Sequence, residues 1–263
     1  MIDLGTKTAQ SIYINNKEVD NIVINNDTVY KKLTEYFYIT NLNNTAGVIT
    51  FTRNGTYDSQ NNAGEFEYST DKTTWNTIDV SSTNTLNISS LGTVYLRNTK
   101  GVLNTQTSRI TITCDQTFKI GGNLMSLVNY ADIAMNIPQF CFYNLFKDSV
   151  KLRSSSELIL SDKVSRYCYY NTFRGCTLLI SAPVIKSPTT VEGCYYSTFY
   201  ECSNLNSITT YYSGSGYPSL NGPFDNWLYN TRTTGDFYNL GGGVFLTDSE
   251  SGIPTGWTVH TSL

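Results

Sequence analysis

The alternation of hydrophobic and polar positions changes along the chain, and each change predicts a different kind of structure. Within residues 11–30, a ten-residue phrase of alternating β-branched residues occurs twice, with Asn15-Asn16 and Asn25-Asn26 at equivalent positions. Asn-Asn accepts the positive φ angles of two-residue turns, so each copy predicts a β-hairpin. Together the copies predict a four-stranded meander inside a module of residues 1–35.

One face of this predicted sheet is aliphatic and has no second layer of its own. Small isolated sheets are marginal in water, so we expect either another molecule or the rest of this chain to cover that face. The pairing that aligns the face places Ile14 opposite Lys17 and Ile22 opposite Val29. The predicted docking or oligomer face consists of Ile12, Ile14, Val19, Ile22, Ile24 and Val29.

Residues 36–118 contain short alternating runs, such as "YFYITNL" and "GVITFTRNG", which are separated by clusters of turn residues. No helical period interrupts them. Strands at this spacing predict an antiparallel sandwich of immunoglobulin type.

Residues 119–263 follow a longer period. The phrases "CFYNLFKDSVKL", "CYYNTFRGCTLL" and "CYYSTFYECSNL" begin at Cys141, Cys168 and Cys194, which are 27 and 26 residues apart. Such a period predicts a solenoid with one strand and one short helix in each repeat. Later residues predict a degenerate fourth repeat and a C-terminal cap around Trp257. The predicted fold class is therefore multidomain and β-rich, followed by α/β repeats.

The six cysteines are expected to be buried structural thiols. Their even number allows disulfides, but three of them mark the repeat period, and Cys176 follows Cys168 by eight residues. On a helix that offset is too long for a disulfide. No C-x-x-C pair is present, and His260 is the only histidine, so the sequence predicts no metal site.

Charge and composition narrow the possible partners. The net charge is -3 and Lys and Arg do not cluster, so we expect no nucleic-acid partner. No apolar run reaches membrane-spanning length, so no membrane insertion is expected. The polar, tyrosine-rich composition is typical of extracellular or virion surfaces, whereas "MIDLGTKTAQ" lacks the features of a secretory signal. A virion protein, assembled in the host cytoplasm and released by lysis, satisfies both observations.

The sequence predicts no enzyme and no cofactor. A catalytic triad would require His260, which lies near the C-terminus. The glycine-rich 240–244 lacks the Lys-Ser/Thr of a phosphate loop. Asp225, Asp236 and Glu250 show no evident pairing of the kind that glycoside hydrolysis uses.

Tyrosines are the best candidates for ligand binding, since they are favoured at protein interfaces. One of the two aromatics after each repeat cysteine should be exposed, and the loop 209–227 is long and aromatic. The alternative is that these side chains cover the end of the solenoid. The candidate ligand-binding residues are Tyr169, Tyr196, Tyr211, Tyr212, Tyr217 and Trp227.

The repeat phrases, closing on "GIPTGWTV" at 252–259, resemble the BspA-type leucine-rich-repeat proteins of gut Bacteroidales and their tailed phages, the crAss-like phages among them. The opening hairpins are similar to a module at the N-termini of phage virion proteins. The chain departs from the repeat pattern at Ser149, where later repeats have Cys176 and Cys202.

This resemblance implies a structural protein of a phage head or tail fibre. The hairpin module would dock on other virion proteins, the sandwich would be a spacer, and the repeats would bind a glycan or a host-surface protein. Fibres are symmetric, so a homodimer or homotrimer is expected. Two alternatives remain open: a bacterial cell-surface adhesin, and an accessory part of a glycan-degrading enzyme.

Overall fold

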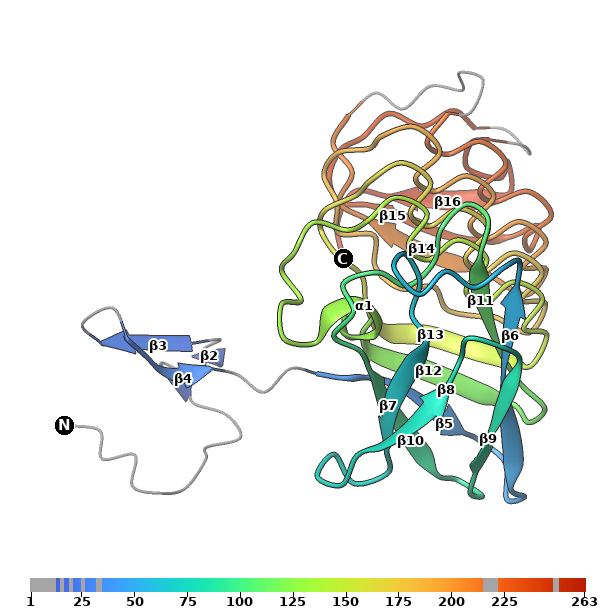
Figure 1. The fold of residues 1–263 in the computed structure, drawn as a ribbon. Helices are drawn as coiled ribbons and strands as arrows, with labels where there is room; N and C mark the ends of the chain where they lie inside the picture. The colour runs from blue at the N-terminus through green and yellow to red at the C-terminus, as the bar shows by residue number, and fades with distance from the viewer. Residues whose placement is uncertain are drawn as a thin grey trace. The chain divides into compact units, whose positions relative to one another are not determined.

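The chain is β-rich and divides into two compact units, Met1–Glu35 and Tyr36–Leu263. The computed structural model shown in Figure 1 describes residues 35–214, 222–247 and 251–263. Before Glu35 it describes only the backbone of 13–14, 17–18, 21–24 and 27–31.

The first unit contains two hairpins, one from each copy of the ten-residue phrase. β1 (Tyr13–Ile14) pairs antiparallel with β2 (Lys17–Glu18), and β3 (Asn21–Ile24) pairs antiparallel with β4 (Asp27–Lys31). The described pairings stay within each copy. They form two two-stranded sheets and do not form the single meander that the sequence predicted.

The register of the first hairpin matches the prediction and that of the second does not. Ile14 lies opposite Lys17 as expected, but Ile22 lies opposite Tyr30 and not opposite Val29. The register shifts between Ile22 and Val23, which is the signature of one extra residue in a β-bulge. The side chains of the predicted docking face lie outside the described residues, namely those of Ile12, Ile14, Val19, Ile22, Ile24 and Val29.

The second unit begins with two sheets. The larger has the strand order β13-β12-β5-β10-β7-β8, and the smaller has the order β11-β6-β9. All of these pairs are antiparallel except β12 with β13. The strands are β5 (Phe37–Asn41), β6 (Gly47–Asn54), β7 (Glu65–Ser69), β8 (Asn76–Asp79), β9 (Asn84–Ile88), β10 (Thr93–Arg97), β11 (Arg109–Cys114), β12 (Phe118–Asn123) and β13 (Leu152–Ile159).

Alternation of side chains explains why these sheets have a buried face. In β5, in β11 and in β6 as far as Phe51, every second residue is buried, as strand geometry requires when one face meets a core. The rings of Phe51 in β6 and Phe66 in β7 meet edge to face, with 5.7 Å between centroids. That contact joins the two sheets through the core.

The expected domain boundary between residues 118 and 119 falls at the start of β12. This strand pairs with β5 on one side and with β13 on the other (Figure 1). The segments 36–118 and 119–263 therefore share one sheet and lie in one compact unit.

The short helix that the sequence predicted for each repeat does not form. Among the described residues the one α-helix is α1 (Ser126–Asn129), and the cysteine phrases are runs of turns. The physical reason is a positive φ at every fourth residue, which a right-handed helix does not admit. These positions are Phe140, Asn144 and Asp148; Tyr167, Asn171 and Gly175; Gly193, Ser197 and Glu201; and Asn226 and Asn230.

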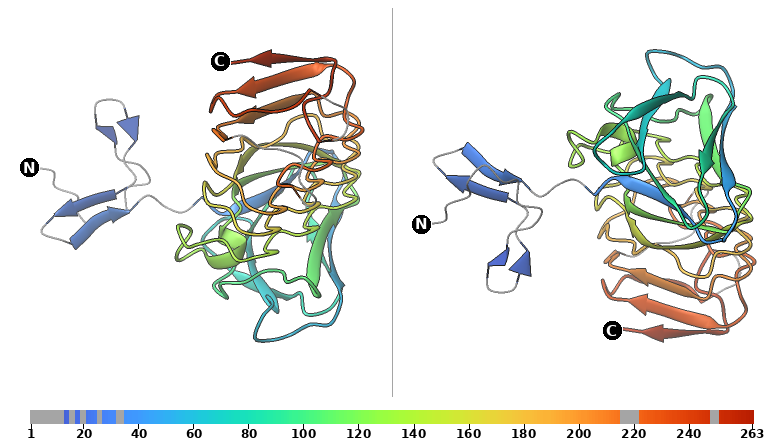
Figure 2. Two further views of the ribbon diagram at one scale, coloured as in Figure 1. Left: turned by 90° about the horizontal axis from the view of Figure 1, so that it is seen from above. Right: turned by 90° about the horizontal axis from the view of Figure 1, so that it is seen from below.

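Backbone N–H groups within each phrase donate to two kinds of acceptor, a carbonyl of the same phrase or a carbonyl of the next copy. Leu145 N donates to Phe142 O three residues back at 3.1 Å, whereas Phe142 N donates to Cys168 O in the next copy at 2.8 Å. The same inter-copy bond joins Tyr169 N to Cys194 O at 2.9 Å. Successive copies therefore lie in register, as the layers of chain in Figure 2 show.

The layers end in a three-stranded parallel sheet. Its order is β14 (Ser207–Thr210), β15 (Gly235–Asn239) and β16 (Trp257–His260) (Figures 1 and 2). The degenerate fourth copy is bonded like the others, because Pro223 O accepts from Tyr195 N at 2.9 Å.

Candidate binding surface

Cysteines occupy the interior of the repeat region, as the sequence predicted. All six are free and buried, with the five from Cys141 to Cys202 in the repeats and Cys114 in β11. Burial raises the pKa of the Cys194 thiol to about 12, and raises that of Cys168 well above its usual value. The thiols are therefore protonated at neutral pH and are poorly suited to act as nucleophiles or metal ligands. Among the described residues, no cluster of three or more His, Cys, Asp or Glu side chains could hold a metal ion.

Buried aromatic rings form columns that run through the copies. Tyr169 stacks between Phe142 and Tyr195, with centroids 5.4 Å apart on each side. Phe173 stacks between Phe146 and Phe199 at 5.5 and 5.4 Å. Each stacked pair contributes about 0.5–1.5 kcal/mol beyond its buried area. These columns belong to the core.

The ligand-binding prediction is wrong for three residues, because their side chains are buried. Tyr169 is 1% exposed within its column, and Tyr212 is 4% exposed. Trp227 is fully buried, and its Nε1 donates to Gly252 O at 3.2 Å. These aromatic side chains pack in the core and are not available to a partner.

The remaining predicted residues differ in their accessibility. Tyr211 is exposed and Tyr196 is half-buried. Tyr217 lies outside the described residues. The expectation that one of the two aromatics after each cysteine is buried is confirmed, and in both repeats it is the first, Tyr169 and Tyr195.

The second aromatic of each phrase lies in an outer row, of which only Tyr196 was among the predicted binding residues. Tyr143, Tyr170 and Tyr196 are all half-buried, and their rings stack at 4.5 and 4.7 Å with interplanar angles of 7° and 2°. We call these three residues the tyrosine row. The signal for it was present in the sequence, because all three occupy the second position after a repeat cysteine.

Most ring faces in the tyrosine row are already covered. Inner faces stack on one another, the Arg109 guanidinium lies 4.0 Å from the centroid of Tyr143, and Asn226 Nδ2 is 3.5 Å from the Tyr196 hydroxyl. Burial and the neighbouring Tyr143 and Tyr196 raise the pKa of Tyr170 to about 12. The row therefore suits a polar ligand, which it can meet with ring edges and protonated hydroxyl groups, better than a ligand that stacks on a ring.

A groove of about 590 Å³ that is lined mostly by polar residues runs across the same copies, and we call it the polar groove. Asp148 and Glu201 supply its carboxylates, and Gly175 occupies their equivalent position in the copy between them. Lys147 Nζ pairs with Asp148 at 2.9 Å. The other lining residues are Val150, Thr177, Ser203, Asn230 and Thr231.

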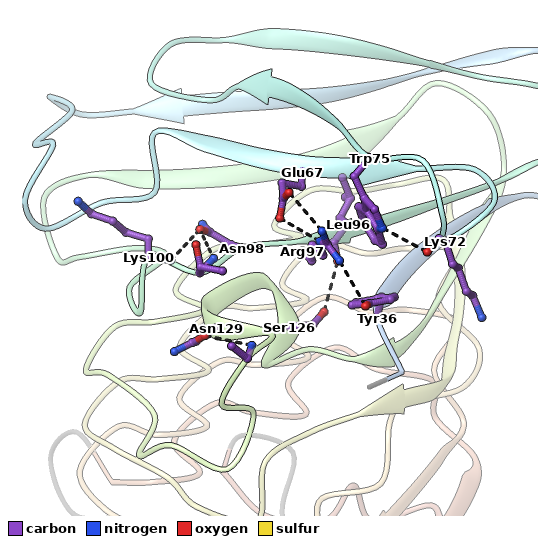
Figure 3. Close-up of polar contacts among 12 residues, drawn as sticks. Tyr36, Glu67, Lys72, Trp75, Leu96, Arg97, Asn98, Lys100, Ser126 and Asn129 are labelled. Carbon is purple, nitrogen blue, oxygen red and sulfur yellow. Dashed lines mark hydrogen bonds and ion pairs between the residues drawn. The ribbon is translucent and has the colours of Figure 1, made fainter. Parts of the chain in front are cut away.

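A cluster of aromatic rings around Arg97 is a structural feature, although it resembles a cation-binding cage (Figure 3). The guanidinium lies 3.7 Å from the ring centroid of Trp75 and 4.2 Å from that of Tyr130. It also pairs with Glu67 at 2.9 Å and donates to the Tyr36 hydroxyl at 3.3 Å. The chain thus fills this cage with its own cation.

His260, Asp236 and the glycine-rich segment, which were considered for catalysis, have structural partners. His260 Nε2 lies 2.8 Å from Asp236 Oδ1, and the imidazole stacks on Tyr238 at 4.6 Å between centroids. In the glycine-rich segment, Gly243 O accepts from Asn239 Nδ2 at 2.7 Å, which closes a turn. No helix in the described part of the chain has the length and apolar character needed to cross a membrane.

Comparison with known proteins gave no match to a protein-family model, to a curated protein or to a solved structure.

Proposed function

We propose that this chain is a non-enzymatic, structural protein of a tailed-phage particle, such as a head or tail fibre. In this proposal the two-sheet part of the second unit, which extends past residue 118 through β12 and β13, is an immunoglobulin-like spacer, and the stacked copies are a leucine-rich-repeat solenoid of BspA type. The bonds between successive copies, such as Tyr169 N to Cys194 O, support stacked repeats. The fibre role rests on the resemblance of the repeat phrases and of the opening hairpins.

The observation that carries the docking role is the separate first unit. Its described strands form only two-stranded sheets, and an isolated two-stranded hairpin is marginally stable in water at best. Burial of a Val or Ile side chain contributes about 1.5–3 kcal/mol, so a partner that covers the aliphatic residues of these hairpins would stabilise the unit. That partner is another virion protein, with further copies of this chain forming a dimer or trimer.

The repeat region supplies the outward surface in this proposal. The tyrosine row and the polar groove lie on consecutive copies, so an extended ligand could follow both. Hydroxyl, carboxylate and amide groups in these two features suit a glycan or a polar protein surface on the host.

Particle incorporation tests the docking role. Particles assembled with a chain lacking residues 1–35 should not contain the protein by mass spectrometry, and Ile24→Asp in the full chain should have the same effect. Val23→Asp is the matched control, because Val23 belongs to the opposite predicted face. Incorporation of the truncated chain at the normal level would contradict the proposal.

A further inference from the structure

A second polar pocket lies away from the repeats, among loops at one end of the six-stranded sheet. Its volume is about 420 Å³, within the range of about 300–1,000 Å³ typical of small-molecule sites. It combines the start of β7, the end of β8 and the loop that follows β10. The lining residues are Tyr57, Gly64, Glu65, Asp79, Ser81, Asn98, Thr99 and Lys100.

Charges of both signs meet in this pocket. Glu65 and Asp79 place two exposed carboxylates on its wall, and Lys100 places an exposed ammonium there. Asp79 Oδ1 accepts from Ser81 N at 2.7 Å, which holds that carboxylate in place. The pocket therefore offers hydrogen-bond acceptors and donors side by side.

Tyr57 gives the pocket an aromatic wall whose position is fixed. The Arg53 guanidinium lies 5.6 Å from its ring centroid, and Arg53 is itself held by a bond of 2.7 Å from Nη2 to Val80 O. Gly64 allows the phenol to approach closely, because a methyl group at this position would collide with the Tyr57 hydroxyl oxygen. The ring is thus placed by contacts on more than one side.

The side-chain amide of Asn98 has one atom that is hydrogen-bonded and one that is not, among the described residues. Its Oδ1 accepts from Thr99 N at 2.7 Å and from Lys100 N at 2.9 Å, the turn seen in Figure 3. The residue is 7% exposed, and its buried Nδ2 has no hydrogen-bond partner within the described part of the chain. Such a group costs about 1–3 kcal/mol while it stays unpaired. Because Asn98 lines the pocket, a ligand oxygen that meets Nδ2 after a small shift of this side chain would remove that cost.

We propose that this pocket binds a neutral sugar unit of a glycan. A sugar hydroxyl both donates and accepts hydrogen bonds. The hydroxyls of one bound sugar can therefore donate to Glu65 and Asp79 and accept from Lys100. The two carboxylates would repel an anion, and the Lys100 ammonium would repel a simple cation. The site does not depend on the docking role of residues 1–35 or on the repeat surface.

Saturation-transfer NMR on the full-length chain tests the site, with a panel of neutral hexoses, N-acetylhexosamines and their oligosaccharides as probes. At least one neutral sugar should show transfer. Glu65→Gln and Tyr57→Ala should each weaken its affinity about tenfold or more, equivalent to about 1.4 kcal/mol. Gly64→Ala should weaken it too, because the added methyl group displaces the tyrosine without removing it.

Two further variants separate this site from the other features. Asn98→Asp keeps the acceptor for Thr99 and Lys100 but removes the donor, so it should weaken sugar binding. Tyr211→Ala, on the repeats, should leave it unchanged. The inference is overturned if no neutral sugar in the panel binds, or if Tyr211→Ala abolishes binding while the pocket variants retain it.

Discussion

Ser149 and Cys176 occupy equivalent positions in successive copies, and each donates a hydrogen bond to a backbone carbonyl of the layer before it. Ser149 Oγ donates to Ile112 O at 2.6 Å, and Cys176 Sγ donates to Phe146 O at 3.1 Å. Cys202 Sγ repeats the contact with Phe173 O at 3.0 Å. The departure from the repeat pattern at Ser149 therefore preserves the donor, and it attaches the first copy to β11.

Ser149→Ala should destabilise the second unit by about 1–3 kcal/mol, because it removes the side-chain donor from a buried carbonyl. Ser149→Cys should recover most of that loss, since the thiol donates from the same position in later copies. Urea unfolding would measure both changes. Ser156→Ala, at an exposed position, is the control and should change stability by less than about 0.5 kcal/mol. Equal stability of Ser149→Ala and the wild type would contradict the assigned role.

Truncation of the buried aromatics should affect folding more than binding. We expect Tyr169→Ala and Trp227→Ala each to cost about 3–5 kcal/mol, as for other large core side chains. Tyr211→Ala should cost less than about 0.5 kcal/mol, because Tyr211 is exposed. Thermal unfolding monitored by circular dichroism would compare the three variants. A small effect of Tyr169→Ala would mean that the column does not support the core.

The repeat period was visible in the sequence because each copy buries the same positions. Cys141, Cys168 and Cys194 are small buried side chains at the start of each layer, so their spacing predicted both register and burial. Hairpins were predictable for a similar local reason: Asn-Asn pairs interrupt β-branched runs at residues 15–16 and 25–26.

The backbone of the phrases could not be predicted from side-chain pattern alone. Phe140 and Tyr167 have φ angles of 57° and 55°, which these residue types rarely adopt, and the inter-copy bonds support that geometry. Helical spacing was therefore the wrong guide to which tyrosine faces outward. The parallel pairing of β12 with β13 joins segments far apart in sequence and has no local signal.

Arg97→Lys tests whether the aromatic cage is structural. Lysine keeps the charge but loses the two-nitrogen contact with Glu67, at 2.9 and 3.2 Å, and the planar stacking on Trp75. We expect a loss of about 1–3 kcal/mol in the free energy of unfolding. Arg166→Lys is the matched control, because that side chain is 52% exposed and its ion pair contributes little. Equal effects of the two substitutions would argue against the cage.

Alkaline pH should destabilise the repeat region through its buried thiols. In the unfolded chain a thiol ionises near pH 8.5, whereas burial raises the pKa of Cys194 to about 12 and that of Cys176 well above its usual value. Above about pH 8.5 the unfolded state releases these protons and the folded state keeps them, so the free energy of unfolding falls as pH rises. Below that pH the thiols should contribute no pH dependence.

Each buried thiol contributes a slope of up to about 1.4 kcal/mol per pH unit in that range. Cys176→Ser retains a hydrogen-bond donor toward Phe146 O but does not ionise, so its unfolding free energy should fall less steeply with pH than that of the wild type. Urea unfolding under reducing conditions, in steps from pH 7 upward, would give both slopes. The comparison depends on the slope, so a constant loss of stability in the variant does not affect it. Identical slopes would show that Cys176 is not protected from ionisation in the folded chain.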